Sequence, residues 1–268
     1  PLANMNVTIS INGRDYIRQS DENGTASIAI NLDSKNYTVV TTFGGTSKYF
    51  GTSINNTVSI LSTIISKDIV KYYRNGTQFY ATVLDFKGNP LANTTVTFNI
   101  NGVFYNRTTD ENGTASIAIR LLPGEYKASA LFNGTDDYDM AAVNASVLVK
   151  NTILGNDTTL YFRNGTQYVA KFLDGNGKAL ANTDVKFNIN GVFYTRVTDE
   201  NGIARLNIRL DPASYIITAY NPVTGEQKAN NITVLPRIIA KDLSMKYLDG
   251  STFNAALVDG QGDRKSVV

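Results

Sequence analysis

Cysteine, histidine and tryptophan are all missing from this 268-residue sequence. Zinc sites use mainly cysteine and histidine, thiol nucleophiles need cysteine, and Ser-His-Asp triads need histidine. These sites are therefore excluded, and disulfides are excluded with them. We expect no catalytic residue, no cofactor and no metal site.

The sequence also lacks a large excess of positive or negative charge. Its 25 lysine and arginine residues nearly balance its 23 aspartate and glutamate residues, and the net charge is +2. Nucleic-acid binding depends on a strong positive surface, so we expect no nucleic-acid partner. No apolar run approaches the roughly 18 residues that a membrane helix needs. We expect no membrane insertion within this segment.

Repetition is the main feature that the sequence does have. The segment NINGVFYNRTTDENGTASIAIR begins at Asn99, a close copy NINGVFYTRVTDENGIARLNIR begins at Asn188, and a looser copy SINGRDYIRQSDENGTASIAIN begins at Ser10. Successive copies start 89 residues apart. This period is too long for a solenoid coil and is typical of a chain of small domains.

A second landmark sets the predicted boundaries. The turn RNGT at Arg74 recurs at Arg163 and, more loosely, as LDGS at Leu248. We predict four segments: a partial domain lacking its leading strands (1–66), two complete domains (67–155 and 156–240) and the leading strands of a further domain (241–268).

Each unit is predicted to consist of strands joined by tight turns. Apolar and polar residues alternate over residues 95–100, as in a half-buried strand, and Asn101-Gly102 then gives a strong hairpin signal. This turn pairs Phe98 with Tyr105 and predicts that Tyr105 faces the core. No window has a convincing helical period, so the fold class is all-β, with one β-sandwich per 85–89 residues.

Large side chains on the inner faces are predicted to be buried. They are Phe98, Tyr105, Ile117 and Tyr126 in one complete domain and Phe187, Tyr194, Leu206 and Tyr215 in the other. Tyr126, like its equivalents Tyr37 and Tyr215, opens a late strand just after a tight turn. It is interpreted either as a tyrosine corner, whose hydroxyl bonds back to the chain, or as a plain core tyrosine.

The segment PLANTTVTFNINGVFYNRTTDENGTASIAIRLLPGEYKASA, which begins at Pro90, resembles a known repeat. It is similar to the Ig-like repeat of the large adhesin-like surface proteins of methanogenic archaea and, more loosely, to Ig-like modules of bacterial adhesins and invasins. The similarity covers nearly the whole chain. It implies tandem Ig-like domains in an extracellular protein of the cell surface.

Thirteen Asn-x-Ser/Thr triplets are candidates for N-glycosylation. They begin at Asn6, Asn23, Asn36, Asn55, Asn75, Asn93, Asn106, Asn112, Asn133, Asn144, Asn156, Asn164 and Asn231. Several lie in predicted Asn-Gly-Thr turns, where a transferase could reach them. We favour a glycosylated surface protein, with turn-forming and solvent-facing asparagine as the alternative.

Acidic residues raise two further possibilities. The turn DENG, which begins at Asp21, Asp110 and Asp199, and the group Asp136, Asp137 and Asp139 could offer oxygen ligands to calcium, but turn formation explains DENG without a metal. Glycoside hydrolysis would need two carboxylates across a cleft, and a small sandwich has a filled core. We therefore expect that the protein is not an enzyme.

Two other features bear on function. A Lys–Asn cross-link would need a recurring inward lysine, whereas Lys71 aligns with Leu160 and Met245. Phe104 and Phe193 are predicted to point outward, and exposed aromatic residues suit sugar stacking or protein contact. Cover by a neighbouring domain or a glycan is the alternative.

The repeat favours a structural and adhesive function, because the distance that the protein spans grows with the number of units, whereas the chemistry of a site does not. A carbohydrate- or protein-binding module that acts by avidity is the alternative, and the sequence does not name its surface ligand. Residues 241–262 match the strands that residues 1–66 lack. Either both ends are parts cut from a longer repeat protein, or copies of the chain complete each other head to tail.

Overall fold

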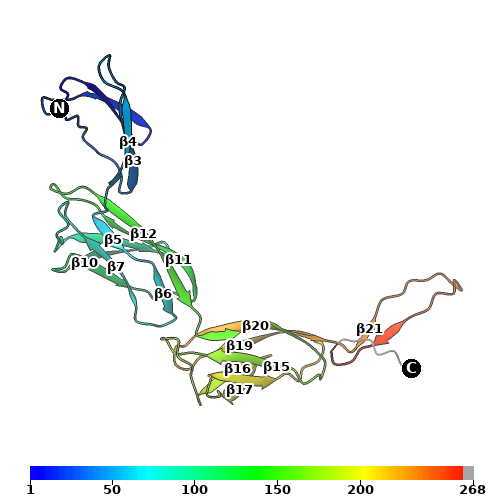
Figure 1. Ribbon diagram of the computed structural model, residues 1–268. Helices are drawn as coiled ribbons and strands as arrows, with labels where there is room; N and C mark the ends of the chain where they lie inside the picture. Colours follow the sequence, from blue (N-terminus) through cyan, green and yellow to red (C-terminus); the bar gives the residue numbers. More distant parts are fainter. Residues whose placement is uncertain (262–268) are drawn as a thin grey trace.

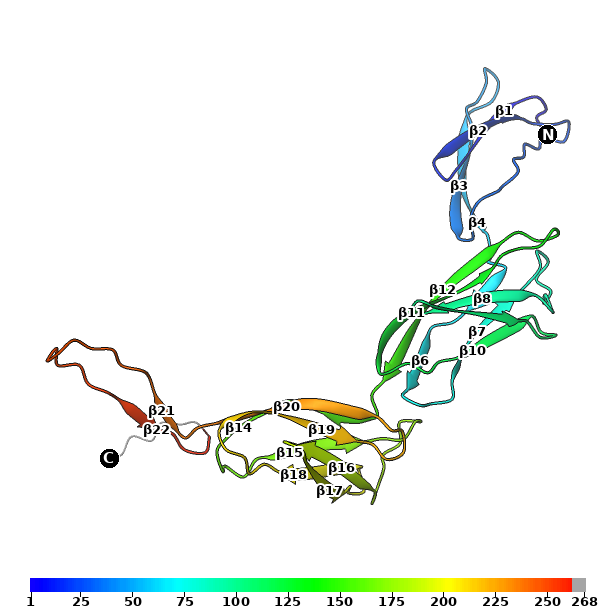
Figure 2. The ribbon, with the colours of Figure 1, turned by 180° about the vertical axis from the view of Figure 1, so that it is seen from behind.

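A computed structural model describes residues 1–261 and contains strands and turns without any helix in that range. Two complete β-sandwiches lie between an N-terminal sheet and a C-terminal hairpin, and this sheet and this hairpin lie at opposite ends of the arrangement (Figures 1 and 2). The fold is therefore all-β, as predicted, with tandem Ig-like sandwiches. Residues 262–268 of the last predicted unit lie outside the described part.

The N-terminal sheet has four antiparallel strands in the order β2-β1-β3-β4. They are β1 (Asn6–Ile11), β2 (Arg14–Gln19), β3 (Asn36–Phe43) and β4 (Thr52–Ser59). Its small apolar cluster is built around Ile9, Ile11, Tyr37 and Val39.

The first sandwich has a three-stranded sheet, β10-β7-β5, and a five-stranded sheet, β6-β12-β11-β8-β9. Its strands are β5 (Ile64–Ser66), β6 (Ile69–Tyr72), β7 (Gln78–Val83), β8 (Thr95–Ile100), β9 (Val103–Thr108), β10 (Thr114–Ala118), β11 (Gly124–Phe132) and β12 (Ala141–Lys150). Only the pairing of β6 with β12 is parallel.

The second sandwich repeats this topology with the orders β13-β15-β18 and β14-β20-β19-β16-β17. Its strands are β13 (Ile153–Gly155), β14 (Thr158–Tyr161), β15 (Gln167–Phe172), β16 (Asp184–Ile189), β17 (Val192–Val197), β18 (Ile203–Asn207), β19 (Ala213–Tyr220) and β20 (Gln227–Leu235). The C-terminal hairpin pairs β21 (Ile238–Ala240) with β22 (Ala255–Leu257).

The strand pairing moves the predicted domain boundaries. β5 pairs with β7, and β13 pairs with β15, so each short strand belongs to the sandwich that follows it. The predicted boundaries at residues 67 and 156 fall just after these strands and therefore lie a few residues too late. The sequence landmarks missed them because three-residue strands show no clear alternation.

Buried aromatic rings pack against each other at the centre of each sandwich. Phe98 is 0% exposed and packs edge-to-face against Phe79, with ring centroids 5.5 Å apart. Phe187 packs in the same way against Tyr168, at 5.6 Å. Such contacts between two sheets are the core packing expected of a sandwich.

The hairpin register is confirmed, but the predicted burial of Tyr105 is wrong. Phe98 pairs with Tyr105 across β8 and β9, yet Tyr105 is 36% exposed. Strand β9 lies at the edge of its sheet and every one of its residues is exposed. The guanidinium of Arg107 lies 5.8 Å from the Tyr105 ring. Its equivalent Tyr194 is half-buried against the second core.

The tyrosine-corner interpretation is confirmed. The hydroxyl of Tyr126 donates to the carbonyl oxygen of Leu122 at 2.9 Å, and its half-buried ring packs on the first core. The equivalents Tyr37 and Tyr215 make the same bond, each at 3.0 Å, to Asp33 and Asp211. Each hydroxyl thus fixes the turn that leads into its strand.

Candidate functional site: turns, domain junctions and exposed surfaces

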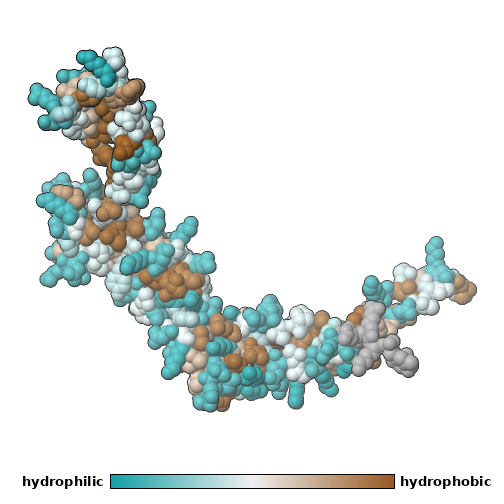
Figure 3. Space-filling view, viewed as in Figure 1, coloured by the Kyte–Doolittle hydropathy of each residue, from teal (hydrophilic) through white to brown (hydrophobic). Residues whose placement is uncertain are grey.

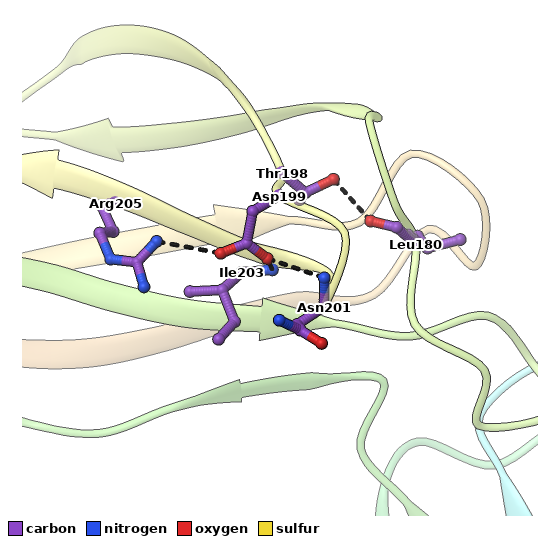
Figure 4. A network of polar contacts seen from close by, with 6 residues as sticks. All are labelled: Leu180, Thr198, Asp199, Asn201, Ile203 and Arg205. Carbon is purple, nitrogen blue, oxygen red and sulfur yellow. Dashed lines mark hydrogen bonds and ion pairs between the residues drawn. The ribbon is translucent and has the colours of Figure 1, made fainter.

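The aspartate of the DENG turn is used to build the turn itself. In the second sandwich, Oδ1 of Asp199 accepts the backbone N–H groups of Asn201 at 2.9 Å and Ile203 at 3.0 Å (Figure 4). Arg205 donates to Oδ2 at 3.1 Å. The Ile203 bond, with the Arg205 contacts, lowers the pKa of this carboxyl. Its charge is therefore engaged within the turn.

The other DENG copies show the same geometry. Asp110 accepts from Asn112 and Thr114, and Asp21 accepts from Asn23 and Thr25, at 2.8–2.9 Å. These contacts support turn formation over calcium ligation. Over residues 1–261, no three acidic side chains are grouped in a way that could hold a metal ion.

Lys71 is the one buried lysine among the described residues, and its ammonium group is bonded only to backbone carbonyls. Nζ donates to the carbonyl oxygens of Asn75 at 2.5 Å, Ile119 at 3.0 Å and Thr77 at 3.3 Å. Burial lowers the pKa of this lysine. None of these partners is a side-chain amide, so the contacts give no support to a Lys–Asn cross-link.

The junction between the sandwiches is held by a turn-to-turn contact. Nδ2 of Asn75 donates to Oδ1 of Asn176 at 3.2 Å. Oδ1 of Asn75 meanwhile accepts the backbone N–H of Thr77 at 2.7 Å, which orients the amide. Beside this contact, Gly177 has φ +83°, and a Cβ there would come 2.3 Å from the Tyr72 ring. Glycine thus allows the close approach.

A similar contact, with a backbone oxygen as the acceptor, occurs one unit further along. Nδ2 of Asn164 donates to the carbonyl oxygen of Gly260 at 3.0 Å, and its Oδ1 accepts from Thr166. Asn164 is the repeat equivalent of Asn75. An Asn-Gly-Thr turn of one unit therefore touches the Asp-Gly-rich turn of the next unit at both places.

A buried carboxylate fixes the chain where the second sandwich begins. Glu226 is 4% exposed, and its Oε2 accepts from the Thr152 hydroxyl at 2.6 Å, the Thr152 N–H at 2.5 Å and the Ile153 N–H at 3.1 Å. Asn221 also bonds to Thr152, at 3.2 Å. This network immobilises the start of β13 directly after the linker, which favours a defined junction.

The candidate glycosylation sites divide into two groups. Twelve of the thirteen asparagines are exposed, and Asn75 is half-buried. In three of them the side-chain nitrogen, where a glycan would attach, already donates a hydrogen bond: Asn75, Asn164 and Asn231. The junction use of Asn75 and Asn164 could not be found from the triplet pattern, which treats all thirteen alike.

The predicted outward aromatic residues are exposed. Phe104 on β9 is 68% exposed and Phe193 on β17 is 61% exposed. The Phe193 ring lies 5.8 Å from the Tyr220 ring, whereas Leu131 takes the place of Tyr220 in the first sandwich. Tyr220 therefore adds a second aromatic ring beside Phe193, at a position where the first sandwich has leucine.

One pocket of about 570 Å3 lies at the end of the second sandwich and is lined by Phe162, Arg163, Gly165, Thr166, Asn207, Ile208, Arg209 and Asp211. Asp211 is the single carboxylate among these residues, so this pocket lacks the pair that glycoside hydrolysis needs. The equivalent pocket of the first sandwich is about 250 Å3.

Within residues 1–261 we find no helix long and apolar enough to cross a membrane.

No protein-family model matches the sequence, and no curated protein matches it either. Solved structures share remote likeness. A Ca2+-stabilised ice-binding adhesin of an Antarctic bacterium is 18% identical, with 89% of this chain and 67% of that chain covered and a TM-score of 0.27.

Two further structures show the same level of likeness. The fibronectin(III)-like modules of Clostridium thermocellum CbhA are 17% identical over 65% of this chain and 94% of theirs, with a TM-score of 0.25. Trypsin-activated α2-macroglobulin from Escherichia coli is 10% identical over 96% of this chain and 24% of that chain, with a TM-score of 0.36. At these identities and TM-scores, the likeness carries no argument about the function of this chain.

Proposed function

We propose that this chain is part of an extracellular structural and adhesive protein, a tandem Ig-like stalk of an archaeal cell-surface adhesin or filament. The observation that carries the proposal is the junction hydrogen bond made by Asn75 and repeated by Asn164. A contact that recurs at successive boundaries sets the direction of one unit relative to the next. A chain of such units holds a distal region away from the surface to which it is attached.

The features that are repeated between the two sandwiches agree with this proposal. The features shared by both sandwiches are core packing, turn aspartates and tyrosine corners, all of which stabilise the fold. A β-strand of eight residues spans about 27 Å, so each added unit extends the stalk by a few nanometres. The resemblance to methanogen surface repeats supplies the archaeal and cell-surface part of the proposal.

Surface accessibility on intact producing cells tests this function. Antibodies against the second sandwich should label unpermeabilised cells, and external protease should remove the epitope while a cytoplasmic marker stays intact. Labelling that requires permeabilisation would contradict the proposal.

A second function is favoured by Phe104 and Phe193, which remain exposed on matching edge strands. We propose as the alternative that these rings contact a surface glycan or protein, with avidity across units. The double variant Phe104→Ala and Phe193→Ala should then lose binding on a glycan or cell-wall array. Phe86→Ala serves as the control, because Phe86 is an exposed aromatic residue in a turn. If the unaltered chain bound nothing on the array, this second function would be contradicted.

A further inference from the structure

The ammonium group of Lys71 has a complete set of hydrogen-bond partners in the backbone of the first sandwich. A lysine ammonium carries three N–H donors, and its three partners here are the carbonyl oxygens of Asn75, Thr77 and Ile119. Because Lys71 is 4% exposed, these oxygens replace water around the charge. The end of the first sandwich is thus a binding site for a primary ammonium group, and the chain's own lysine occupies it.

The second sandwich keeps the three carbonyl groups but not the lysine. Leu160 occupies the position of Lys71 and is 3% exposed. The equivalent carbonyl groups belong to Asn164, Thr166 and Ile208. Among the described residues, no backbone or side-chain donor bonds to any of these three oxygens. They are therefore acceptors that the protein itself does not use.

The backbone around these carbonyl groups follows the same course in both sandwiches. The N–H of Asn164 donates to the carbonyl oxygen of Tyr161 at 3.1 Å, as the N–H of Asn75 does to Tyr72 at 3.1 Å. The arginine before each asparagine has a positive φ, +55° in the second sandwich and +61° in the first. Strand β15 also pairs with β18 in the register in which β7 pairs with β10. We therefore expect the three oxygens of the second sandwich to face one point, as those around Lys71 do.

The carbonyl groups adjoin the pocket of about 570 Å3 at the end of the second sandwich, which Thr166 and Ile208 help to line. All residues that line this pocket belong to the second sandwich. The equivalent pocket of the first sandwich is lined by the first sandwich alone, although a complete sandwich follows it. The pocket is therefore a feature of the single unit and does not depend on what precedes or follows that unit.

Two further differences make the second pocket more polar. Asp211 occupies the position of Leu122, and Asn207 occupies the position of Ala118. Within residues 1–261 the carboxylate of Asp211 forms no ion pair. The second sandwich thus loses an internal cation and gains a carboxylate at the same end. This combination favours a cation that comes from outside the unit.

The positive charges of the pocket do not exclude such a cation. Arg163 and Arg209 line the pocket of the second sandwich. Their equivalents Arg74 and Arg120 line the first pocket, beside the carbonyl groups that bind the Lys71 ammonium. The first sandwich therefore shows that the same two arginines are compatible with an ammonium group at these carbonyl oxygens.

We propose that the pocket of the second sandwich binds the ammonium group of a lysine side chain from another protein, at the point that Nζ of Lys71 occupies in the first sandwich. The three N–H donors bond to the carbonyl oxygens of Asn164, Thr166 and Ile208. The carboxylate of Asp211 adds electrostatic attraction at the pocket wall.

A lysine fits this site better than an amino sugar does. Lys71 reaches its three carbonyl oxygens because its ammonium group ends an unbranched alkyl chain. The ammonium group of an amino sugar is attached to a ring, which would have to enter between the carbonyl groups. Figure 3 also shows hydrophilic and hydrophobic residues side by side on the visible face of the second sandwich. A ligand with a charged end and an apolar stem suits such a surface.

NMR titration of the full chain with small amines tests the recognition. The probe is n-butylammonium, which has the end group and stem of a lysine side chain. It should shift the backbone amide signals of residues 163–166 and 207–211 but not those of residues 74–77 and 118–122. N,N,N-trimethylbutylammonium is the matched control, because it keeps the charge and the stem but has no N–H donor. Glucosamine is the third probe and should shift these signals less than n-butylammonium does.

Two variants test the site from the side of the protein. Leu160→Lys supplies an internal ammonium group, as in the first sandwich, and should abolish the shifts. Asp211→Leu restores the residue type of the first sandwich and should lower the affinity for n-butylammonium about twofold to fivefold. Asp184→Leu is its control, because Asp184 is exposed and lies outside the pocket. If Leu160→Lys does not fold, the comparison of Asp211→Leu with Asp184→Leu decides.

The inference is overturned if n-butylammonium shifts none of the pocket signals, or if the trimethylated probe shifts them equally. Stronger binding of glucosamine would overturn the choice of lysine. Unchanged binding in a folded Leu160→Lys chain, or equal affinity in the two aspartate variants, would also contradict the site. These measurements use the purified chain, so their result does not depend on the cell-surface function proposed above.

Discussion

The side-chain nitrogen of Asn75 donates to the side-chain oxygen of Asn176, 3.2 Å away in the next sandwich. The contact joins two turns that lie 101 residues apart in the sequence. Its recurrence between Asn164 and Gly260 shows that the junction is part of the repeat. Tandem domains joined by a flexible linker need no such contact, whereas a stalk of defined direction does.

The junction contact can be removed without damaging the turn. Asn75→Asp keeps the oxygen that accepts from Thr77 and removes the donor to Asn176. We expect the sandwiches to retain their folds but to reorient relative to each other. Residual dipolar couplings should fit one alignment tensor for both sandwiches in the natural chain and two tensors in the variant. Asn112→Asp is the control, because that turn bonds to Asp110 of its own sandwich. One shared tensor in Asn75→Asp would remove the role of this bond.

Glycan occupancy should follow the hydrogen bonding of the asparagine side chains. In protein from its natural source, we expect glycans at exposed sites such as Asn106 and Asn112. We expect none at Asn75, Asn164 or Asn231, whose side-chain nitrogens donate to protein oxygens. Glycopeptide mass spectrometry measures this pattern. High occupancy at Asn75 together with an unchanged junction would contradict the role assigned to its nitrogen, and an intact mass equal to 29.2 kDa would contradict glycosylation altogether.

The two cores should unfold independently when one is damaged. Phe98→Ala removes a fully buried ring that packs on Phe79 and should destabilise the first sandwich by about 3–5 kcal/mol. Phe187→Ala should have the same effect on the second sandwich. Calorimetry should show one transition shifted to lower temperature and the other retained. The exposed Phe104→Ala should shift neither. Simultaneous loss of both transitions would mean that the sandwiches form one cooperative unit.

Alkaline pH should affect the two sandwiches in opposite directions. Burial, with a smaller contribution from the charge of Asp157, raises the pKa of Tyr168 to about 12. The unfolded chain therefore loses this proton first, near pH 10, and the second sandwich loses stability as pH rises from about 10 to 12. Tyr168→Phe should abolish this loss, because phenylalanine has no hydroxyl to titrate. Phenylalanine is the matched replacement, because Phe79 occupies the equivalent position in the first sandwich. Equal alkaline sensitivity of Tyr168→Phe and the natural chain would contradict the assignment.

Deprotonation of Lys71 should change the stability of the first sandwich in the opposite direction. Burial lowers its pKa, so the folded state releases the proton at a lower pH than the unfolded state does. The first sandwich should therefore gain stability, relative to Lys71→Leu, as pH rises through the lowered pKa toward 10.5. Leucine is the matched replacement because Leu160 occupies this position in the second sandwich and is buried. Denaturant unfolding of both forms at neutral and alkaline pH gives the difference, and a constant difference would contradict the depressed pKa.

Local sequence rules predicted much of the fold. The Asn101-Gly102 turn set the pairing of Phe98 with Tyr105, and the spacing before Tyr126 indicated its corner hydrogen bond. These features depend on neighbours within one unit. The exposure of Tyr105 depended instead on β9 being an edge strand, which the alternation of residues does not reveal.

The same local sequence rules could not predict the contact between the two sandwiches. Asn75 and Asn112 both lie in Asn-Gly-Thr, yet only Asn75 faces the next sandwich. The difference comes from how two folded units meet. The network around Glu226 was missed for a related reason, since its side chains Glu226 and Asn221 lie 74 and 69 residues from Thr152, to which they bond.

Deleting one period tests the central claim of a stalk whose length depends on unit number. Removal of residues 75–163 joins Arg74 to Asn164 and restores the RNGT turn. A label at the distal end should lie outside the cell envelope in electron tomograms of producing cells, and the deletion should bring its mean position closer by one unit, about 3 nm or more from strand length. An unchanged mean distance, or a label inside the envelope, would contradict the account.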